Sequence, residues 1–142
     1  MGLTVARAGL GDVQTLAAEY QRDGTLQGAA EPPLPTGAVF WLARDEDGEP
    51  VGYAACKLSP EGIVAGPVYV RAQHRRSGVG MALIQEIERW ATGARIPVVE
   101  VSVAADNPAG VRFLEAAGFS VRRLLMARDQ DGQGGARVGD GP

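Results

Sequence analysis

The sequence has one cysteine, Cys56, and one histidine, His74, among its 142 residues. A single cysteine excludes an intramolecular disulfide, and these two side chains are too few for a structural metal bound by cysteine and histidine, so we expect no metal site. No uninterrupted apolar run approaches the length that crosses a bilayer. Residues 1–14 lack the basic, apolar and small-residue pattern of a secretory signal. These absences favour a cytoplasmic protein without membrane contact.

An excess of positive charge is also lacking. The chain carries 14 Lys and Arg against 17 Asp and Glu, a net charge of -3 at pH 7. Proteins that bind nucleic acid through its phosphates are usually basic, so we expect no nucleic-acid partner. The length fits one globular domain with its own core. We expect that domain over residues 1–128 and a flexible tail over 129–142, because the tail is rich in glycine and poor in apolar residues.

The spacing of apolar residues predicts a mixed α/β sheet with helices on its faces. The order of elements is β, α, a β meander and then βαβαβ, in which the helix after the meander makes a parallel, right-handed crossover. Gly66-Pro67 interrupts one strand and predicts a bulge there. Strands are expected over residues 3–7, 38–44, 50–58, 61–70, 97–106 and 119–128, and helices over 9–23, 78–92 and 107–118, with a loop and a short helix near 24–30.

The stretch QHRRSGVGMAL, residues 73–83, places two arginines and two glycines where a helix begins. The first turn of a helix presents unpaired N–H groups and the positive end of the helix dipole, which favour an anion. Gly78 and Gly80 leave room for a phosphate, and Arg75 and Arg76 add charge. The pattern predicts a phosphate or pyrophosphate cradle. The alternative is that the glycines relieve crowding and the arginines are a solvated face.

Two familiar phosphate loops can be compared with this turn. A P-loop requires Lys followed by Ser or Thr, and the sequence has no such pair. A dinucleotide fingerprint would place its third glycine at Leu83, and residues 71–77 separate the first glycine from the preceding strand. Glu100 lies at roughly the distance of a ribose contact. The dinucleotide site therefore stays open as an alternative.

A third comparison matches more of the chain. Arg75, Gly78 and Gly80 match the R/Q-x-x-G-x-G/A acyl-CoA signature of the GNAT N-acetyltransferase superfamily, and the sequence resembles that family over nearly all of residues 3–128. NPAGVRFLEAAGF, residues 107–119, resembles its asparagine-to-Gly-Phe segment. The resemblance implies the GNAT acyl-CoA N-acyltransferase fold with a splayed central strand pair. It also implies transfer of the acetyl group of acetyl-CoA to a primary amine of a small molecule or a protein.

The resemblance also implies a donor site. The backbone of Val68, Tyr69 and Val70 would pair with the pantetheine arm, and an N–H near Val70 would hold the oxyanion. Asn107 would contact the arm from the other side, and a plain helix cap explains this residue equally well. The pyrophosphate would be bound by Arg75, Arg76, Ser77, Gly78, Val79, Gly80 and Met81.

The catalytic groups depart from the family pattern. An amine of pKa about 10.4 is almost fully protonated at neutral pH, so a base is useful. The position of the usual tyrosine acid is Leu114, and that of a glutamate base is Ser102. Glu100 could act through water and Tyr69 could replace the acid, although an exposed strand-end charge and a packed tyrosine explain them as well. The alternative function is an acyl-CoA-binding module with little turnover.

Residues 23–35 coincide with the acceptor-binding loop of the family. Asp23 and Glu31 are expected to attract a cationic amine there. The weak last strand leaves a sheet edge that a second subunit could cover, which predicts a homodimer.

Overall fold

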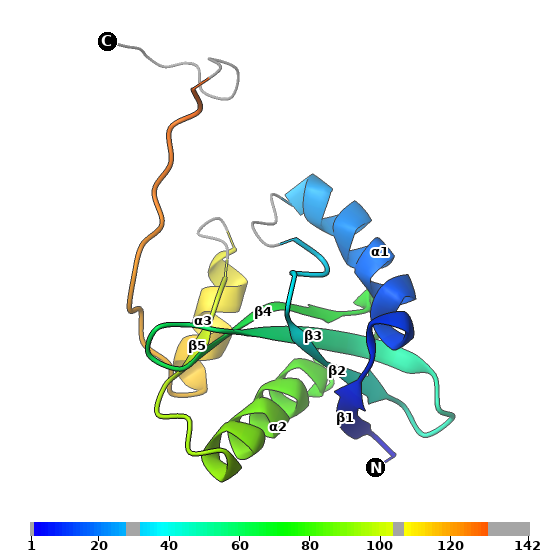
Figure 1. Cartoon of the computed structure of the whole chain (residues 1–142). Coiled ribbons are helices and arrows are strands. Elements are labelled where there is room, and N and C mark those ends of the chain that lie inside the picture. The colour runs from blue at the N-terminus through cyan, green and yellow to red at the C-terminus, as the bar shows by residue number, and fades with distance from the viewer. Residues whose placement is uncertain (1, 28–31, 104–106, 131–142) are drawn as a thin grey trace. The chain divides into compact units, whose positions relative to one another are not determined.

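A computed structural model describes residues 2–27, 32–103 and 107–130. The chain forms two compact units, Met1–Val111 and Arg112–Pro142. The first contains the sheet and two of its helices (Figure 1). The predicted division into a domain over 1–128 and a tail over 129–142 stays a prediction, since residues from 131 onward lie outside the described part.

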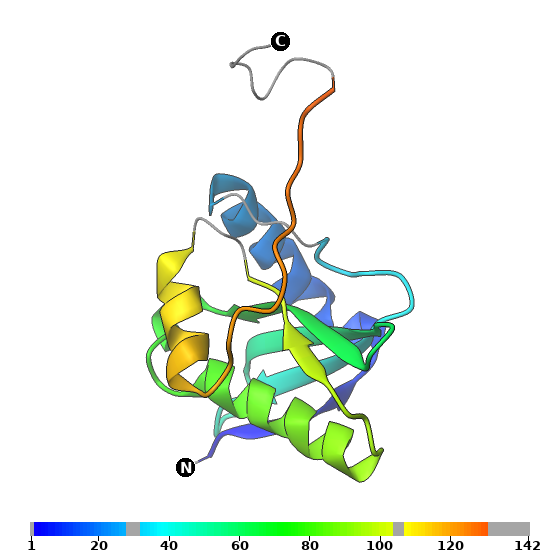
Figure 2. The ribbon, with the colours of Figure 1, turned by 90° about the vertical axis from the view of Figure 1, so that its left-hand side faces the viewer.

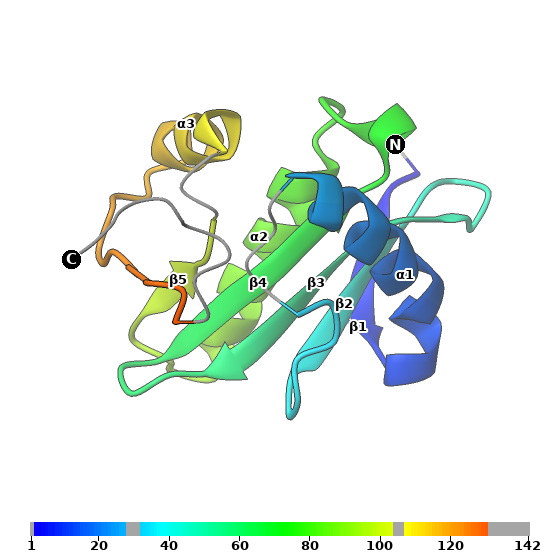
Figure 3. The same ribbon diagram turned by 90° about the horizontal axis from the view of Figure 1, so that it is seen from above.

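The first unit contains its strands and long helices in the predicted order. The elements are β1 (Thr4–Ala8), α1 (Leu10–Gln27), β2 (Val39–Arg44), β3 (Pro50–Leu58), β4 (Ile63–Val70), the 3-10 turn η1 (Ala72–His74), α2 (Val79–Gly93), β5 (Val99–Val101) and the start of α3 (Pro108–Ala116). The strands lie in the order β1-β2-β3-β4-β5 (Figure 3), with β5 parallel to β4 and the other neighbours antiparallel. The predicted meander and parallel crossover are confirmed.

The sheet lies between α1 and α2 (Figure 2). Alternate residues of a strand point to opposite faces, so β2 contributes Trp41 to the α2 side and Leu42 to the α1 side. Leu16 of α1 and Leu83 of α2 each belong to a row of apolar residues at helical spacing, and both are almost completely buried. Burying a side chain of this size contributes roughly 2 kcal/mol. The two cores therefore hold α1 and α2 on opposite faces.

A β-bulge occurs in β4 at Gly66-Pro67, as predicted. Ala54 pairs with Val68, whereas Cys56 pairs with Ala65, so two residues of β4 lie opposite one residue of β3. The extra residue reverses which side chains face each helix.

The consequence of the bulge is seen at Tyr69. Ala65, before the bulge, and Val68, after it, both pack in the core on the α2 side of the sheet. In a regular strand, residues an odd number of positions apart would face opposite sides. Tyr69 therefore packs in the α1 core. Without the extra residue, its side chain would point to the other face of the sheet.

Three expectations are corrected. The helix α1 continues to Gln27, so a separate short helix near 24–30 is wrong for the described residues, and 28–31 lie outside them. The expected strand over 97–106 is reduced to β5. The expected strand over 119–128 is wrong, because residues 119–130 form no helix or strand.

The segment that was expected to form this last strand lies in the second unit. Its segment after α3 exposes large apolar side chains, of which Leu125 is 95% accessible. The sequence RRLLM, residues 122–126, does not alternate polar and apolar residues, and a strand gains stability only when its backbone is paired. Across the described parts of both units, no helix is long and apolar enough to cross a membrane.

Candidate functional site

The turn between β4 and α2 presents free backbone donors. Gly78 is the N-cap of α2, and within the described residues no side chain caps this end. The first helical hydrogen bond runs from the N–H of Ala82 to the carbonyl of Gly78 at 3.0 Å. The N–H groups of the first turn, Val79, Gly80 and Met81, therefore have no acceptor within the helix. The positive end of the helix dipole coincides with them.

Gly78 keeps this turn accessible. Its φ of 89° lies in the left-handed region, which glycine adopts without strain. A Cβ built at this position would meet nothing within 4 Å, so the space beside the backbone is open. Open space next to several N–H groups fits the oxygens of a phosphate. The phosphate cradle stays a prediction, which this open turn supports.

The two arginines of the turn lie differently. Arg76 is exposed and has a φ of 64°. Arg75 donates from Nε to the carbonyl of Val70 at 2.8 Å, and its Nη2 lies 3.8 Å from Oδ2 of Asp23. Its guanidinium carbon lies 5.7 Å from the centre of the Tyr69 ring. The charge of Arg75 is thus shared with a carboxylate of α1.

The last residues of β4 have an edge that faces away from β3. The N–H of Arg71 donates to the carbonyl of Val51 at 2.9 Å. Because antiparallel pairing alternates, Tyr69 also pairs toward β3, while Val68 and Val70 direct their N–H and C=O groups to the opposite edge.

The neighbour on that edge, β5, accompanies β4 only over its first residues. Their pairing ends at Ala65 and Val101, and the N–H of Ser102 donates to the carbonyl of Ala65 at 2.8 Å. The edge formed by Val68 and Val70 lies beyond this point. It is suited to pair with another extended chain.

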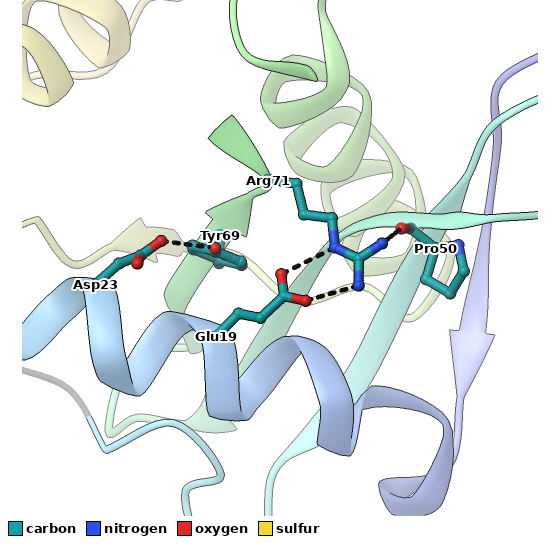
Figure 4. Close-up of polar contacts among 5 residues, drawn as sticks. All are labelled: Glu19, Asp23, Pro50, Tyr69 and Arg71. Carbon is teal, nitrogen blue, oxygen red and sulfur yellow. Dashed lines mark hydrogen bonds and ion pairs between the residues drawn. The ribbon is translucent and has the colours of Figure 1, made fainter. Parts of the chain in front are cut away.

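Two carboxylates of α1 reach the end of β4 (Figure 4). The hydroxyl of Tyr69 donates to Oδ2 of Asp23 at 2.8 Å. One turn earlier in the helix, Glu19 accepts two hydrogen bonds from the guanidinium of Arg71. Residues four apart share a helix face, which is why both carboxylates point to β4. The structure therefore brings together Asp23, Tyr69 and Arg75 of the predicted site.

The environment shifts the acidity of these groups. Burial raises the pKa of Tyr69 to about 12, and the hydrogen bond to Asp23 adds to this effect. The hydroxyl is therefore protonated at neutral pH and acts as a donor. The hydrogen bond from Arg71 lowers the pKa of Glu19 against the opposing effect of burial, and the same bond raises the pKa of Arg71.

Other predicted residues lie apart from this group. Glu100 pairs with Val64 of β4, five residues before Tyr69, which is about 15 Å along the strands. Glu100 points to the face of β5 opposite to Val99, which packs against α2, and Ser102, just after β5, follows the same alternation.

Three further positions complete the comparison with the sequence. Leu114, which stands where the family has its tyrosine acid, is 8% exposed in α3. Glu31 lies outside the described residues. The N–H of Gly110 donates to Oδ1 of Asn107 at 3.0 Å, so the predicted cap of α3 is confirmed.

Sequence reasoning missed Glu19 and Arg71. The four-residue spacing of Glu19 and Asp23 was a signal that one face of α1 carries two acids. Their partners are Tyr69, in β4, and Arg71, which follows β4, and the pairing had no local signal because 52 residues separate Glu19 from Arg71.

The match to a family model shows that the protein is of the acyltransferase class. The chain belongs to the acetyltransferase (GNAT) family, whose model matches residues 13–119. It is similar to a mycothiol acetyltransferase of Stackebrandtia nassauensis, with 31% identity over 103 residues, 69% of this chain and 34% of the relative. It is also similar to an aminoglycoside N(6')-acetyltransferase type 1 of Klebsiella aerogenes, with 33% identity over 58% of this chain and 60% of the relative.

This chain therefore spans about a third of the first relative and less than two thirds of the second. A solved structure of AAC(6')-Iy in complex with the bisubstrate analogue CoA-S-monomethyl-acetylneamine has the same fold, with a TM-score of 0.68. The match has 17% sequence identity and covers 92% of this chain and 99% of the other.

Proposed function

We propose that the chain transfers the acetyl group of acetyl-CoA directly to a primary amine in a ternary complex. The acceptor is a small molecule or the amine of a peptide or protein. The carrying observation is the edge of β4 at Val68 and Val70, with which no other strand pairs within the described residues, followed after η1 by the uncapped first turn of α2. Family membership and the acetyltransferase names of both relatives support the same reaction.

The donor site follows the family. The pyrophosphate binds the turn formed by Arg75, Arg76, Ser77, Gly78, Val79, Gly80 and Met81. The pantetheine arm pairs with the segment Val68, Tyr69 and Val70, mainly through the outward groups of Val68 and Val70. Asn107 contacts the arm from the other side, in addition to capping α3. The donor supplies a thioester, whose carbonyl carbon the amine attacks.

The chain's own groups and water handle charge and protons. An acceptor bound as ammonium first gives one proton to water. The carbon–nitrogen bond then forms as the carbon–sulfur bond breaks, the amine nitrogen loses a second proton and the thiolate gains one. The N–H of Val70 stabilises negative charge on the carbonyl oxygen. The one proton of the Tyr69 hydroxyl is directed to Asp23, so Tyr69 serves the thiolate only once that hydrogen bond has broken. The ordinary thiol pKa of about 8.5 already makes the thiolate a tolerable leaving group, and water can protonate it. Water takes the protons that the acceptor loses, because Glu100 lies about 15 Å from Tyr69 along the strands and Ser102 stands where the family has its glutamate base.

The acceptor approaches from the side of α1. Asp23 lies beside Tyr69 and carries the negative charge that an ammonium group needs. Glu31 is proposed to add to that charge. The cytoplasmic location, the lack of nucleic-acid and membrane partners, the lack of a metal and a homodimeric state stay predictions.

The second candidate is an acyl-CoA-binding module with little turnover. It is favoured by Leu114 and Ser102, which replace residues used for catalysis in the family. Titration with acetyl-CoA and measurement of CoA release over a broad panel of primary amines separate the two. Tight binding with release for at least one amine supports the transferase, whereas tight binding without transfer to any acceptor supports the module.

The dinucleotide alternative has its own test. Thermal unfolding is measured with acetyl-CoA and with NADH, since a ligand that binds the folded state raises the midpoint. We expect acetyl-CoA to stabilise the protein. Stabilisation by NADH alone would overturn the proposed function.

A further inference from the structure

Arg75 belongs to the proposed phosphate turn, yet its side chain is directed to the acceptor side. Its Nε is bound to the carbonyl of Val70 and its Nη2 forms an ion pair with Asp23 at 3.8 Å. The ring of Tyr69 lies beneath its guanidinium. The guanidinium of Arg75 thus interacts with a carboxylate of α1, although Arg75 lies only three residues before Gly78.

The same carboxylate is held in place by a neutral donor. The hydroxyl of Tyr69 binds Oδ2 of Asp23, the oxygen that also faces Arg75. Because Tyr69 carries no charge, the positive charge next to Asp23 comes from Arg75. An ammonium group that approaches Asp23 therefore meets a cation already paired with it.

The ion pair between Arg75 and Asp23 breaks easily. The side chains of Arg75 and Asp23 are 43% and 41% exposed, so water and salt weaken their attraction. A pyrophosphate offers Arg75 more negative charge and bidentate hydrogen bonds, which are stronger than a single contact at 3.8 Å. An anion at the first turn of α2 competes with Asp23 for the same guanidinium.

We propose that Arg75 couples the two substrate sites: it neutralises Asp23 in the free protein and exposes this carboxylate when a pyrophosphate draws the guanidinium away. This inference rests on the proposed function. It specifies the acceptor as an amine that binds in its ammonium form and binds better after the donor. Since coupling between sites is reciprocal, Asp23 must also weaken donor binding.

The reciprocal effect can be measured with CoA alone. Calorimetric titration compares the wild type, Asp23→Asn, Arg75→Gln and the double variant. Asp23→Asn is expected to bind CoA about threefold more tightly, the size of an exposed ion pair. Arg75→Gln is expected to bind more weakly. In the Arg75→Gln background, Asp23→Asn is expected to change nothing, because the shared cation is gone.

A control separates this contact from the general field of the protein. Asp12 lies in the first turn of α1, eleven residues before Asp23 on the same helix. Asp12→Asn removes an equal charge without removing a contact to Arg75, so it is expected to leave CoA affinity within the error of the titration. At about 0.5 M salt, the gain from Asp23→Asn is expected to shrink.

Several outcomes overturn the coupling. They are an unchanged or weaker affinity in Asp23→Asn, an equal gain in Asp12→Asn, or a gain that persists without Arg75. In each of these cases wild-type CoA binding leaves the proposed function standing. If the wild type binds no CoA at all, the proposed function fails and the coupling fails with it.

Discussion

The guanidinium of Arg71 donates two hydrogen bonds to the carboxylate of Glu19, from Nε to Oε1 at 2.8 Å and from Nη2 to Oε2 at 2.7 Å. Its Nη1 donates to the carbonyl of Pro50 at 2.9 Å. Arg71 is the residue immediately before η1. The pair therefore joins α1 and the start of β3 to the base of the turn that we propose for the donor.

Glu19→Gln should lower the free energy of unfolding by about 1–2 kcal/mol, because it removes the charge from a bidentate pair. Both side chains are 22% exposed, so solvent screens the pair only in part. The pKa of Glu19 is lowered in the folded state, so its contribution is present above the ordinary value of 4.5 and is lost as pH falls through the folded pKa. Urea unfolding at neutral and at acid pH measures both effects.

The matched control is Glu86→Gln, which breaks the ion pair with Arg89 on α2. Arg89 is 75% exposed in this pair. We expect a change below about 0.5 kcal/mol. Equal losses of unfolding free energy in Glu19→Gln and Glu86→Gln would show that the Glu19–Arg71 pair contributes no more than the exposed Glu86–Arg89 pair.

Gly78→Glu should abolish CoA binding while the protein still folds. A side chain fits sterically, but the φ of 89° costs about 1–2 kcal/mol for any residue with a Cβ. The added carboxylate repels the pyrophosphate at the helix N-terminus. Calorimetric titration with CoA and thermal unfolding measure the two effects separately.

Two substitutions test whether charge is the cause. Gly78→Ala has the same backbone strain without the charge and fills less of the open space, so it should weaken CoA binding less than Gly78→Glu does. Gly93→Glu places the same charge at the other end of α2, where a Cβ also meets nothing within 4 Å, and should leave CoA affinity unchanged. Full CoA binding by Gly78→Glu would contradict the proposed site.

Asn107→Ala should cost about 1 kcal/mol of stability, because the cap of α3 is lost. Asn107→Ser keeps a capping hydroxyl and removes the amide, so its stability should remain near that of the wild type. If Asn107 also contacts the pantetheine arm, both variants should raise the KM for acetyl-CoA. A higher KM in the alanine variant alone would leave Asn107 as a cap only.

The stability of the protein should fall at alkaline pH. Burial raises the pKa of Cys56 from 9.0 to about 12, and the pKa of Tyr69 is also raised to about 12. A raised folded pKa contributes stability below the unfolded value, which is lost as pH rises toward the folded one. The loss should begin near pH 9 with a slope of up to about 1.4 kcal/mol per pH unit for each group.

Urea unfolding in the presence of a reductant, from pH 8 to pH 11, measures this slope. In Cys56→Ala the decline should start about one unit later, near pH 10, where tyrosines begin to titrate. An unchanged pH dependence in this variant would mean that Cys56 does not take part.

Much of the fold was readable because local rules decide it. Helical spacing around Leu16 and Leu83 and the polar turn at Asp47 depend on neighbours within a few residues. The strand expected over 119–128 was misread, because β-forming residues such as Val121 do not make a strand without a paired neighbour.

The candidate site was readable only in part. Gly78 and Asn107 carry their signals in a few adjacent residues, and the structure shows an uncapped turn and a helix cap there. The contact of Tyr69 with Asp23 spans 46 residues and had no local signal.

The sequence by itself determined the order of strands and long helices up to α3, the glycine turn at Gly78 and the likeness to an acyl-CoA-binding family, because each depends on spacing along the chain. Only the tertiary structure decided that Tyr69 and Arg75 meet Asp23 and that Arg71 meets Glu19. The physical reason is the bulge at Gly66-Pro67, which turns Tyr69 toward α1, together with the packing of α1 on that face. These contacts depend on sheet register and helix docking, which no short stretch of sequence specifies.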